Sequence, residues 1–504
     1  MRIVVIGSGF GGIAAAIRLQ AQGHDVTIVE KLDKPGGRAY VFEKDGFTFD
    51  AGPTIVTAPW VLDELFALTG RSTADYVNLV PVNPFYNVRF EDGSVFNYNG
   101  DKDDLIRQVN EFSPRDVEGY KKFREKSWSI FNIGMPLIDK PFLTLGSMMK
   151  SLPDLIRTRA DRSLAKLTEK HIKDDRLRQV FSFHPLFVGG NPYATSSVYA
   201  LIHKLEQQWG VLFPMGGMGA LVRGLVQAFE DLGGRIRYES EVQEILVADN
   251  RRTTGVKLVS GEQIAADAVV CNGDVVQAYR KLLPKGARSE GTVRRMERLQ
   301  MSMSLFVLYF GTNKQYPDIK HHEILMGARY KALLEDIFER KILSEDFSLY
   351  LHRPTASDPS LAPAGHDCWY VLSPVPHLGS GTDWAAVGQR YRDRIMQYLE
   401  DRYLPDLSQH LVTEHRVDPR YFEQTLNSYM GSAFGPQPVL TQSAWMRPHN
   451  RSKEIPNLYF CGAGTHPGAG LPGVIASGKI VAELIGGAPA RKGAPVPAPS
   501  LAPV

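Results

Sequence analysis

Close to the start of the chain stands the glycine-rich stretch Gly7-Ser8-Gly9-Phe10-Gly11-Gly12, directly after the apolar residues 3–6. Gly7 allows a tight turn out of a strand, Gly9 lets the backbone come close to a pyrophosphate, and Gly12 lets the next helix pack closely on the sheet. A second apolar run, residues 26–29, has the length and alternation of the following strand. The stretch therefore predicts a βαβ unit that binds a dinucleotide, with the pyrophosphate at the N-terminus of the helix.

Glu30 follows the second predicted strand and lies about 18 residues after Gly12. A carboxylate at this position accepts hydrogen bonds from ribose hydroxyls and repels a 2′-phosphate, so NADP is disfavoured as the ligand. The alternative is a glycine-rich turn that binds nothing. The helical spacing of Ala16 and Leu19 and the turn at Gly23 favour the dinucleotide-binding unit.

Composition and charge exclude several classes of protein. The 504 residues suit two or three domains. The net charge is only +3 and the basic residues are spread along the chain, so we expect no nucleic-acid partner. Three widely separated cysteines argue against an extracellular disulfide framework and for a reducing cytoplasm. Because no HExxH motif, paired zinc spacing or nucleophile elbow occurs, we expect no metal, and a zinc enzyme or a hydrolase is disfavoured.

Targeting and membrane-spanning segments are not expected. The chain enters the predicted βαβ unit at once, without a signal peptide before it. No run of about 18 apolar residues occurs, so no helix is predicted to cross a bilayer. The Ala/Pro-rich residues 488–504 are predicted to form a disordered tail.

Two later turns resemble the first in placing glycines at the end of a strand. The predicted strand 268–271 leads into Asn272-Gly273-Asp274, and residues 457–461 lead into a glycine-rich turn and a small-residue helix over 475–485. Shortly after Glu30 comes Pro35-Gly36-Gly37-Arg38, where Arg38 can pair with a phosphate. A solvated surface arginine is the alternative for this short segment.

Other segments have different patterns. Residues 100–212 are mostly helical in pattern, and the hairpin-like stretch 245–264 lies farther on. Residues 304–310 and 369–372 are strongly β-prone, and a helical pattern covers 386–403. These last segments predict a mixed sheet with helices on the substrate side.

The glycine spacing from Gly7 to Arg38 resembles the FAD-binding N-terminus of the amine-oxidase and carotenoid-desaturase flavoproteins. Residues 49–54, 187–192, 440–445 and 464–470 resemble the bacterial phytoene desaturases more specifically. The resemblance extends from Met1 to about Ile485. It implies an α/β fold: a discontinuous Rossmann-like FAD-binding domain, a mixed-sheet substrate domain and an inserted helical, membrane-facing subdomain.

This resemblance also implies a division of the chain. The FAD-binding domain would comprise residues 1–85, 213–290 and 439–487, the helical membrane-facing subdomain 86–212, and the substrate domain 291–438. FAD is the implied cofactor. Its implied binding residues are Gly7, Gly9, Gly12, Glu30, Lys31, Gly36, Gly37, Arg38, Pro53, Thr54, Val242, Asn272, Asp274, Gly462, Gly464, His466, Gly473 and Val474.

The implied reaction is the desaturation of phytoene to neurosporene or lycopene by hydride transfer to flavin N5. Such a reaction requires little acid–base chemistry from side chains, because the cofactor carries the difficult step and the protein orients an apolar chain. Phytoene and partly desaturated carotenoids are the implied ligands, and oxygen or a quinone the electron acceptor. The alternatives are a hydroxycarotenoid desaturase, a polyene isomerase, an amine oxidase and a non-catalytic lipid-binding flavoprotein.

The resemblance places an Arg-Ser step near the access to the substrate site, which here is Arg162-Ser163. Arg162 is therefore a candidate catalytic residue, and Asp161 a candidate proton acceptor. Asp161 departs from the family, in which an aromatic residue is expected. A solvated basic helix face is the alternative interpretation.

An apolar segment beside basic residues predicts contact with a membrane surface. The apolar residues are Ile130, Phe131, Ile133, Met135, Leu137, Ile138, Phe142, Leu143, Leu145, Met148 and Met149, and the cations are Lys150, Arg157, Arg159 and Arg162. This pattern suits an interfacial element on anionic lipid, and a core helix next to a solvated helix is the alternative. We expect a cytoplasmic protein associated peripherally with the inner face of the cell membrane.

Overall fold

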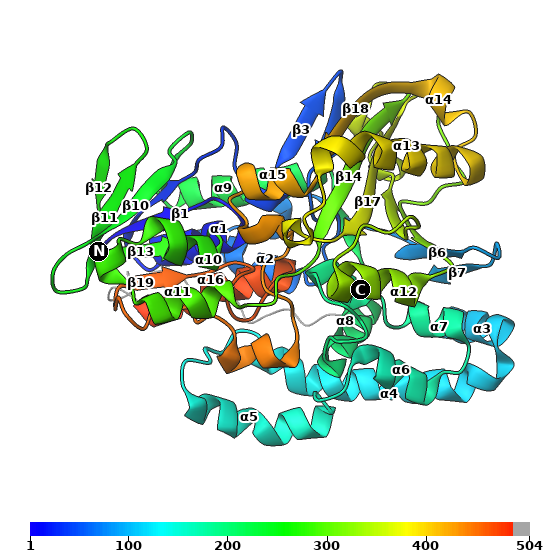
Figure 1. Cartoon of the computed structure of the whole chain (residues 1–504), viewed down its shortest axis with the longest axis horizontal. Coiled ribbons are helices and arrows are strands. Elements are labelled where there is room, and N and C mark those ends of the chain that lie inside the picture. Colours follow the sequence, from blue (N-terminus) through cyan, green and yellow to red (C-terminus); the bar gives the residue numbers. More distant parts are fainter. Residues whose placement is uncertain (487–504) are drawn as a thin grey trace.

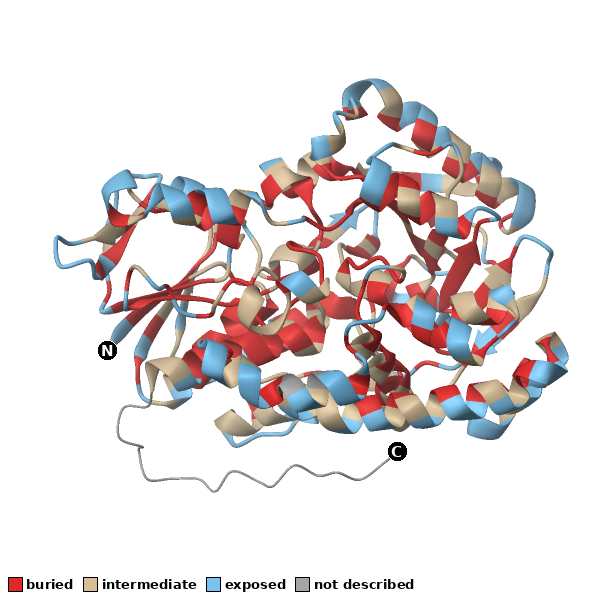
Figure 2. Ribbon diagram, turned by 60° about the horizontal axis from the view of Figure 1, so that its bottom comes forward, coloured by how far each residue is buried: buried red, intermediate tan, exposed pale blue. Residues whose placement is uncertain are grey.

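The computed structural model describes residues 1–486, apart from the side chains of Leu152 and Leu155, so the predicted tail lies outside the described residues. Two sheets organise the chain (Figure 1). A parallel sheet lies beside the N-terminus, a larger mixed sheet lies at the other end, and a group of helices covers the space below them (Figure 1). Figure 2 shows buried residues inside both sheets, whereas the outward faces of the surrounding helices are exposed.

The parallel sheet has the order β19-β13-β1-β2-β9, and each neighbouring pair is parallel. Its strands are β1 (Arg2–Ile6), β2 (Asp25–Val29), β9 (Arg235–Arg237), β13 (Ala268–Cys271) and β19 (Leu458–Phe460). They come from three stretches far apart in sequence. Their short apolar runs are typical of a parallel sheet with both faces covered. The Rossmann-like sheet predicted from the glycine turns is thereby confirmed.

Small residues allow helices to pack closely on this sheet. The helices are α1 (Phe10–Ala21), α9 (Gly217–Asp231) and α16 (Leu471–Ile485). A Cβ on Gly12 would lie 2.2 Å from the carbonyl oxygen of Gly7, and a Cβ on Gly478 would lie 2.7 Å from the backbone nitrogen of Ala15. Glycine is thus required where α1 meets its own strand and where α16 meets α1.

An antiparallel sheet, β10-β11-β12, precedes β13 and corresponds to the predicted hairpin-like stretch. Its strands are β10 (Val242–Val247), β11 (Thr253–Leu258) and β12 (Gln263–Ala265). Two further antiparallel pairs form separate two-stranded sheets: β3 (Val41–Lys44) with β4 (Phe47–Asp50), and β5 (Leu79–Pro81) with β8 (Leu212–Pro214). Two helices follow β13: α10 (Val275–Gln277) and α11 (Glu290–Glu297).

The larger sheet has the order β18-β14-β17-β16-β15-β6-β7 and is antiparallel except between β15 and β6, so the predicted mixed sheet is confirmed. Its strands are β6 (Tyr86–Phe90), β7 (Val95–Tyr98), β14 (Ser304–Thr312), β15 (His322–Met326), β16 (Leu349–His352), β17 (Asp367–Val375) and β18 (Leu411–Val417). Helix α13 (Trp384–Arg402) packs against one face. Shorter helices nearby are α12 (Tyr330–Glu335), α14 (Leu407–His410) and α15 (Pro419–Gln424).

The helical region predicted from residue 100 onward is present. Its helices are α3 (Lys102–Phe112), α4 (Val117–Gly134), α5 (Leu145–Thr158), α6 (Leu164–His171), α7 (Asp175–Val180) and α8 (Leu201–Trp209), with α2 (Trp60–Phe66) earlier in the chain. None of the helices described is long and apolar enough to cross a bilayer. One prediction needs correction: residues 159–162 are not helical, because Arg159 has φ +57° and the chain turns after Thr158.

We predict that Gly12→Ala destabilises the protein, because the new Cβ would overlap the Gly7 carbonyl and force α1 away from the sheet. The free energy of unfolding should fall by about 2 kcal/mol, which urea denaturation measures. Gly286→Ala is the matched control, since a Cβ there meets nothing within 4 Å. It should change the free energy of unfolding by less than about 0.5 kcal/mol, and an equal loss in both variants would contradict the packing argument.

Candidate active site

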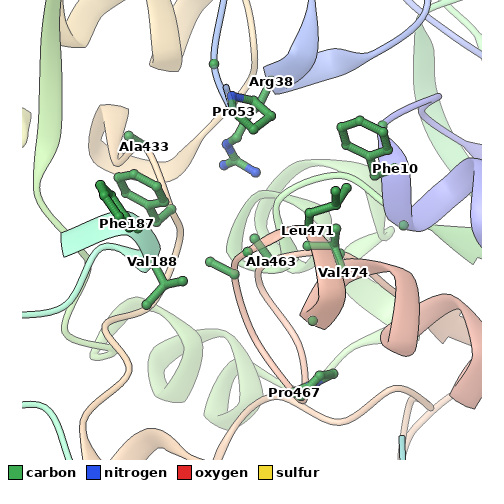
Figure 3. A pocket seen from close by; sticks show the side chains of 18 of the residues that line it. Phe10, Arg38, Pro53, Phe187, Val188, Ala433, Ala463, Pro467, Leu471 and Val474 are labelled. Atoms are coloured by element: carbon green, nitrogen blue, oxygen red, sulfur yellow. The ribbon is translucent and has the colours of Figure 1, made fainter. Parts of the chain in front are cut away.

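A cavity of about 690 Å³ lies between the two sheets and is lined by residues from both. One end is formed by the turn after β1 and by the loop before α16. The other end is formed by side chains on the inner face of the larger sheet, together with residues 183–206. Figure 3 shows Arg38, Phe10 and Leu471 around one part of this space and Phe187 and Val188 on the opposite side. One continuous cavity therefore joins the predicted dinucleotide site to an apolar wall.

Glu30 lines the glycine-rich end and is only 4% exposed. Its Oε2 accepts hydrogen bonds from the backbone N–H (2.8 Å) and hydroxyl (2.7 Å) of Ser8, and its Oε1 accepts one from the N–H of Leu32 (2.9 Å). A carboxylate has about four acceptor positions, so one remains for a ribose hydroxyl. Hydrogen bonds from Ser8, in the glycine-rich turn, therefore hold the carboxylate in place.

Arg38 points its guanidinium into the cavity (Figure 3). One Nη donates to the hydroxyl of Ser428 at 2.7 Å, whereas the buried Nε has no partner among the described residues. Burial lowers the pKa of Arg38, and the nearby charge of Asp274 counteracts that shift. A guanidinium with a free N–H facing a cavity suits a phosphate, which accepts forked hydrogen bonds.

Asn272 fills the space between the glycine turns. A Cβ on Gly9, Gly11 or Gly462 would approach its side-chain amide to 2.9, 2.7 and 2.7 Å respectively. Asp274, two residues on, accepts hydrogen bonds from the N–H groups of Gln277 (3.0 Å) and Tyr429 (3.1 Å). Both line the cavity, and both also hold neighbouring backbone in place.

Most of the predicted cofactor residues line this one cavity. The residues that line the cavity are Gly7, Gly9, Glu30, Lys31, Gly36, Gly37, Arg38, Pro53, Thr54, Val242, Asn272, Asp274, Gly462, His466, Gly473 and Val474. Gly12 and Gly464 do not line it. Gly12 lies under the start of α1, and Gly464 packs against Val275, so their contribution is to backbone packing.

His466 lies in the loop before α16 and is 7% exposed. Neither ring nitrogen has a hydrogen-bond partner among the described residues, and the ring contacts Phe142 edge to face at 5.0 Å between centroids. Burial, aided by the charge of Arg447, lowers the pKa of His466 to about 4. The imidazole is therefore neutral at physiological pH.

The two predicted catalytic residues lie elsewhere. Asp161 and Arg162 are exposed in the turn after α5, and neither lines the cavity. The neighbouring Thr158 and Ala160 do line it, so the segment borders the cavity without turning these two side chains inward. The geometry gives no support to a catalytic role for either residue.

The far end of the cavity is mainly apolar. Its walls include Phe183, Leu186, Phe187, Val188, Leu305, Ile324, Leu349, Leu372, Phe422 and Phe434. The apolar segment predicted to face a membrane contributes to this lining as well, through Ile133, Met135, Leu137, Ile138, Phe142 and Met148. That segment is thus part of the cavity wall, which the sequence pattern did not indicate.

Sequence reasoning missed two polar groups on the cavity wall. The Tyr350 hydroxyl lies 2.6 Å from the Thr54 hydroxyl and 2.6 Å from Nδ1 of His322. Glu206, which is fully buried, accepts a hydrogen bond from the Tyr86 hydroxyl at 2.7 Å and lies 3.0 Å from Nε2 of His184. Neither group has a local motif, because its members come from separate elements.

A group of three buried histidines, His321, His322 and His352, is spaced to hold a metal ion, with ligating atoms within 4.8 Å of one another. Nε2 of His321 and Nε2 of His352 already contact each other at 3.0 Å, and Nδ1 of His321 contacts the Ser357 hydroxyl at 2.6 Å. These contacts engage ring nitrogens of His321 and His352, whereas Nε2 of His322 has no partner among the described residues. Because the His321 and His352 nitrogens already contact each other, we assign no metal to the site.

Known proteins resemble the chain over nearly its whole length. Residues 10–486 match the family of flavin containing amine oxidoreductases. A protein of Pseudescherichia vulneris, named phytoene desaturase (lycopene-forming), is 51% identical over 486 residues, which cover 96% of this chain and 99% of that protein. A phytoene desaturase (neurosporene-forming) of Rhodobacter capsulatus is 43% identical, covering 97% and 94%. An oxidoreductase structure from Methanosarcina mazei shares the fold, with a TM-score of 0.62 and 17% identity over 96% of this chain and 100% of that one.

We predict that His466 makes the cofactor-free protein sensitive to acid. Its pKa is lower in the folded chain than the ordinary 6.5, so the unfolded chain binds more protons between about pH 6.5 and 4, and stability falls as the pH falls through that window. The full shift corresponds to about 3 kcal/mol. Urea denaturation at a series of pH values measures the free energy of unfolding. In His466→Phe this free energy should fall less steeply with falling pH than in the unmodified protein. His366→Phe, at a half-buried ring, is the control, and a slope unchanged in His466→Phe would contradict the prediction.

Proposed function

Because the chain belongs to the flavin-containing amine oxidoreductase family and, within it, to the bacterial phytoene desaturases, we infer that its cavity holds FAD at the glycine-rich end and phytoene along the apolar wall. The chain is an FAD-dependent oxidoreductase that desaturates phytoene to lycopene or neurosporene in carotenoid biosynthesis. The observation that carries the assignment of sites is the continuous cavity between the two sheets. It provides a polar cradle and an apolar channel in contact with each other.

The residues at the glycine-rich end fit the parts of FAD. We assign Glu30 to the ribose and Arg38 to the pyrophosphate, together with the N-terminus of α1, whose free N–H groups favour an anion. The loop from Gly462 to Gly470, together with the first turn of α16, which includes Val474, would hold the flavin ring. We also propose that residues 1–85, 213–290 and 439–487 form the FAD-binding domain, since each segment contributes strands to the parallel sheet or a helix against it.

Bound FAD supplies a hydride acceptor at N5. The chain's own contribution is to orient the polyene against that position and to exclude water, which the apolar wall achieves. Each desaturation removes two hydrogens from neighbouring carbons, one as hydride and one as a proton. We propose oxygen or a quinone as the electron acceptor. No role is assigned to Arg162 or Asp161, which lie outside the cavity lining.

We propose lycopene as the product, because the lycopene-forming relatives are 50–51% identical to this chain and the neurosporene-forming ones 42–43%. The test incubates the purified protein with FAD and phytoene-loaded vesicles and separates the pigments by chromatography. Lycopene as the main end product is the expected result. Accumulation of neurosporene would overturn the product assignment, and unchanged phytoene would overturn the assignment of substrate.

Helix α5 is the element that we propose to contact the membrane. Leu145, Met149 and Ile156 are 56%, 56% and 65% exposed, and their spacing places them along one side of the helix. Met148 and Thr158, on another side, line the cavity. A lipid surface against the exposed side would thus lie one helix away from the substrate channel. The exposed cations Lys150, Arg157 and Arg159 suit anionic headgroups. We place the protein peripherally on the inner face of the cell membrane.

We predict that replacing Leu145, Met149 and Ile156 together by Gln weakens membrane binding, because about 25 cal/mol per Å² of apolar burial is lost. Flotation with anionic vesicles measures the bound fraction, which should fall at least about tenfold.

The matched control replaces Val259, Ile342 and Val412 by Gln, since these apolar side chains are also exposed (61%, 49% and 46%) but lie on other elements. It should float like the unmodified protein. If both triple variants lose binding equally, or neither does, α5 is not the contact.

A further inference from the structure

Arg447 is a buried arginine behind the loop that we assign to the flavin. It is 1% exposed and ranks among the largest fully buried side chains. None of the carboxylates in residues 1–486 forms an ion pair with it, although the chain has many arginine–carboxylate pairs at its surface. Burying a charge without an opposite charge lowers the stability of the folded protein. The charge of Arg447 therefore calls for an explanation other than stability.

Backbone carbonyl groups surround the guanidinium. Nε donates to the carbonyl of Thr465 (2.9 Å), and Nη1 to that of Gln442 (3.3 Å). Nη2 donates to the carbonyls of Pro436 (3.1 Å) and Ala463 (2.7 Å). The side chain therefore joins the segment 436–442 to the loop that begins at Gly462.

Holding these loops does not by itself require a charge. The Asn450 amide donates to the carbonyl of His466 at 2.8 Å, and the Gln442 amide donates to the carbonyls of Gln300 (3.0 Å) and Gln437 (3.2 Å). Each is a neutral side chain that anchors one of these two segments: Asn450 the loop at His466, and Gln442 the segment 436–442. Arg447 differs from them in its charge, which persists at physiological pH because burial lowers its pKa only to about 10.

The charge lies one loop away from the cavity. Ala463 and His466, on either side of the Thr465 carbonyl that Arg447 contacts, line the cavity. A Cβ on Gly468 would lie 3.4 Å from the guanidinium carbon, so this loop packs directly on the charge. Two cavity-lining groups interact electrostatically with the guanidinium. Burial lowers the pKa of His466, and the charge of Arg447 lowers it further. Burial raises the pKa of Tyr199, and the charge of Arg447 counteracts that rise. In a low-dielectric interior such a field reaches across the loop.

We propose that Arg447 acts electrostatically from behind the loop: its positive charge stabilises the negative charge that the flavin gains when a hydride arrives from the polyene. The hydride brings two electrons and one proton to N5, so the ring gains one negative charge, while the substrate's second hydrogen leaves as a proton. The N-terminus of α16 (15 residues) begins at Leu471 in the same loop and adds positive potential. The proposal rests on the proposed placement of the flavin at this loop.

The first test counts protons in the unmodified holoenzyme. The midpoint potential of bound FAD, measured from about pH 6 to about pH 9, shows how many protons accompany two electrons. With the charge stabilised by the protein, one proton per two electrons is expected throughout. Uptake of two protons over the lower half of this range would overturn the proposal, whether or not the enzyme desaturates phytoene.

Variants of Arg447 test whether this residue causes the uptake of only one proton. Arg447→Met should raise proton uptake at the acid end and weaken binding of reduced FAD relative to oxidised FAD at least about tenfold, as linkage requires. Arg447→Lys, which keeps the charge, should restore both quantities. Arg447→Gln, which keeps a donor for one carbonyl, replaces Arg447→Met if the latter does not fold.

Asn450→Ala is the matched control, since it removes a neutral anchor of the same loop. It should change the affinity for FAD without changing the proton count. If Arg447→Met or Arg447→Gln binds FAD with an unchanged proton count and an unchanged ratio of affinities, Arg447 is only a structural anchor and the proposal fails.

Discussion

Three backbone turns approach one another closely around the Asn272 amide, and this contact determines where the rest of the chain can lie. Gly9, Gly11 and Gly462 come so near this side chain that a Cβ on any of them would lie within 3 Å of it. The turns follow β1, β13 and β19, which are parallel neighbours and therefore end at one edge of the sheet. Segments that are far apart in sequence are thus joined at a single point, and the cradle for the dinucleotide exists only where all three meet.

From that edge the cavity extends to the larger sheet, and its chemistry changes along the way. Near the glycine turns, polar groups such as Glu30 and Arg38 are held by hydrogen bonds but keep capacity for a ligand. Toward the larger sheet the walls are apolar, as a hydrocarbon substrate requires. The protein needs no constellation of acids and bases there, because FAD supplies the hydride acceptor. Electrostatic control can then act from behind the loop, where Arg447 is shielded from both water and substrate.

Sequence patterns predicted those elements that interactions between nearby residues determine. Strand–turn–helix units at Gly7 and Gly462 and the strand before Asn272 were visible, because glycine spacing and apolar runs act over a few residues. The joining of β6 and β7 to the larger sheet was not, since it depends on the pairing of β6 with β15, more than 200 residues away. The same holds for the Thr54–Tyr350–His322 contacts and for Arg447, whose partners are backbone carbonyls. Arg162 is a candidate from the resemblance alone, and the turn after α5 leaves its side chain exposed.

If one cavity brings the polyene against FAD, phytoene itself should reduce the bound flavin. Anaerobic mixing of the holoenzyme with phytoene in vesicles measures this, with the flavin absorbance as the readout. The flavin band should bleach, and absorbance of a lengthened polyene should appear with it. Bleaching by a chemical reductant but not by phytoene would mean that the polyene does not reach the flavin.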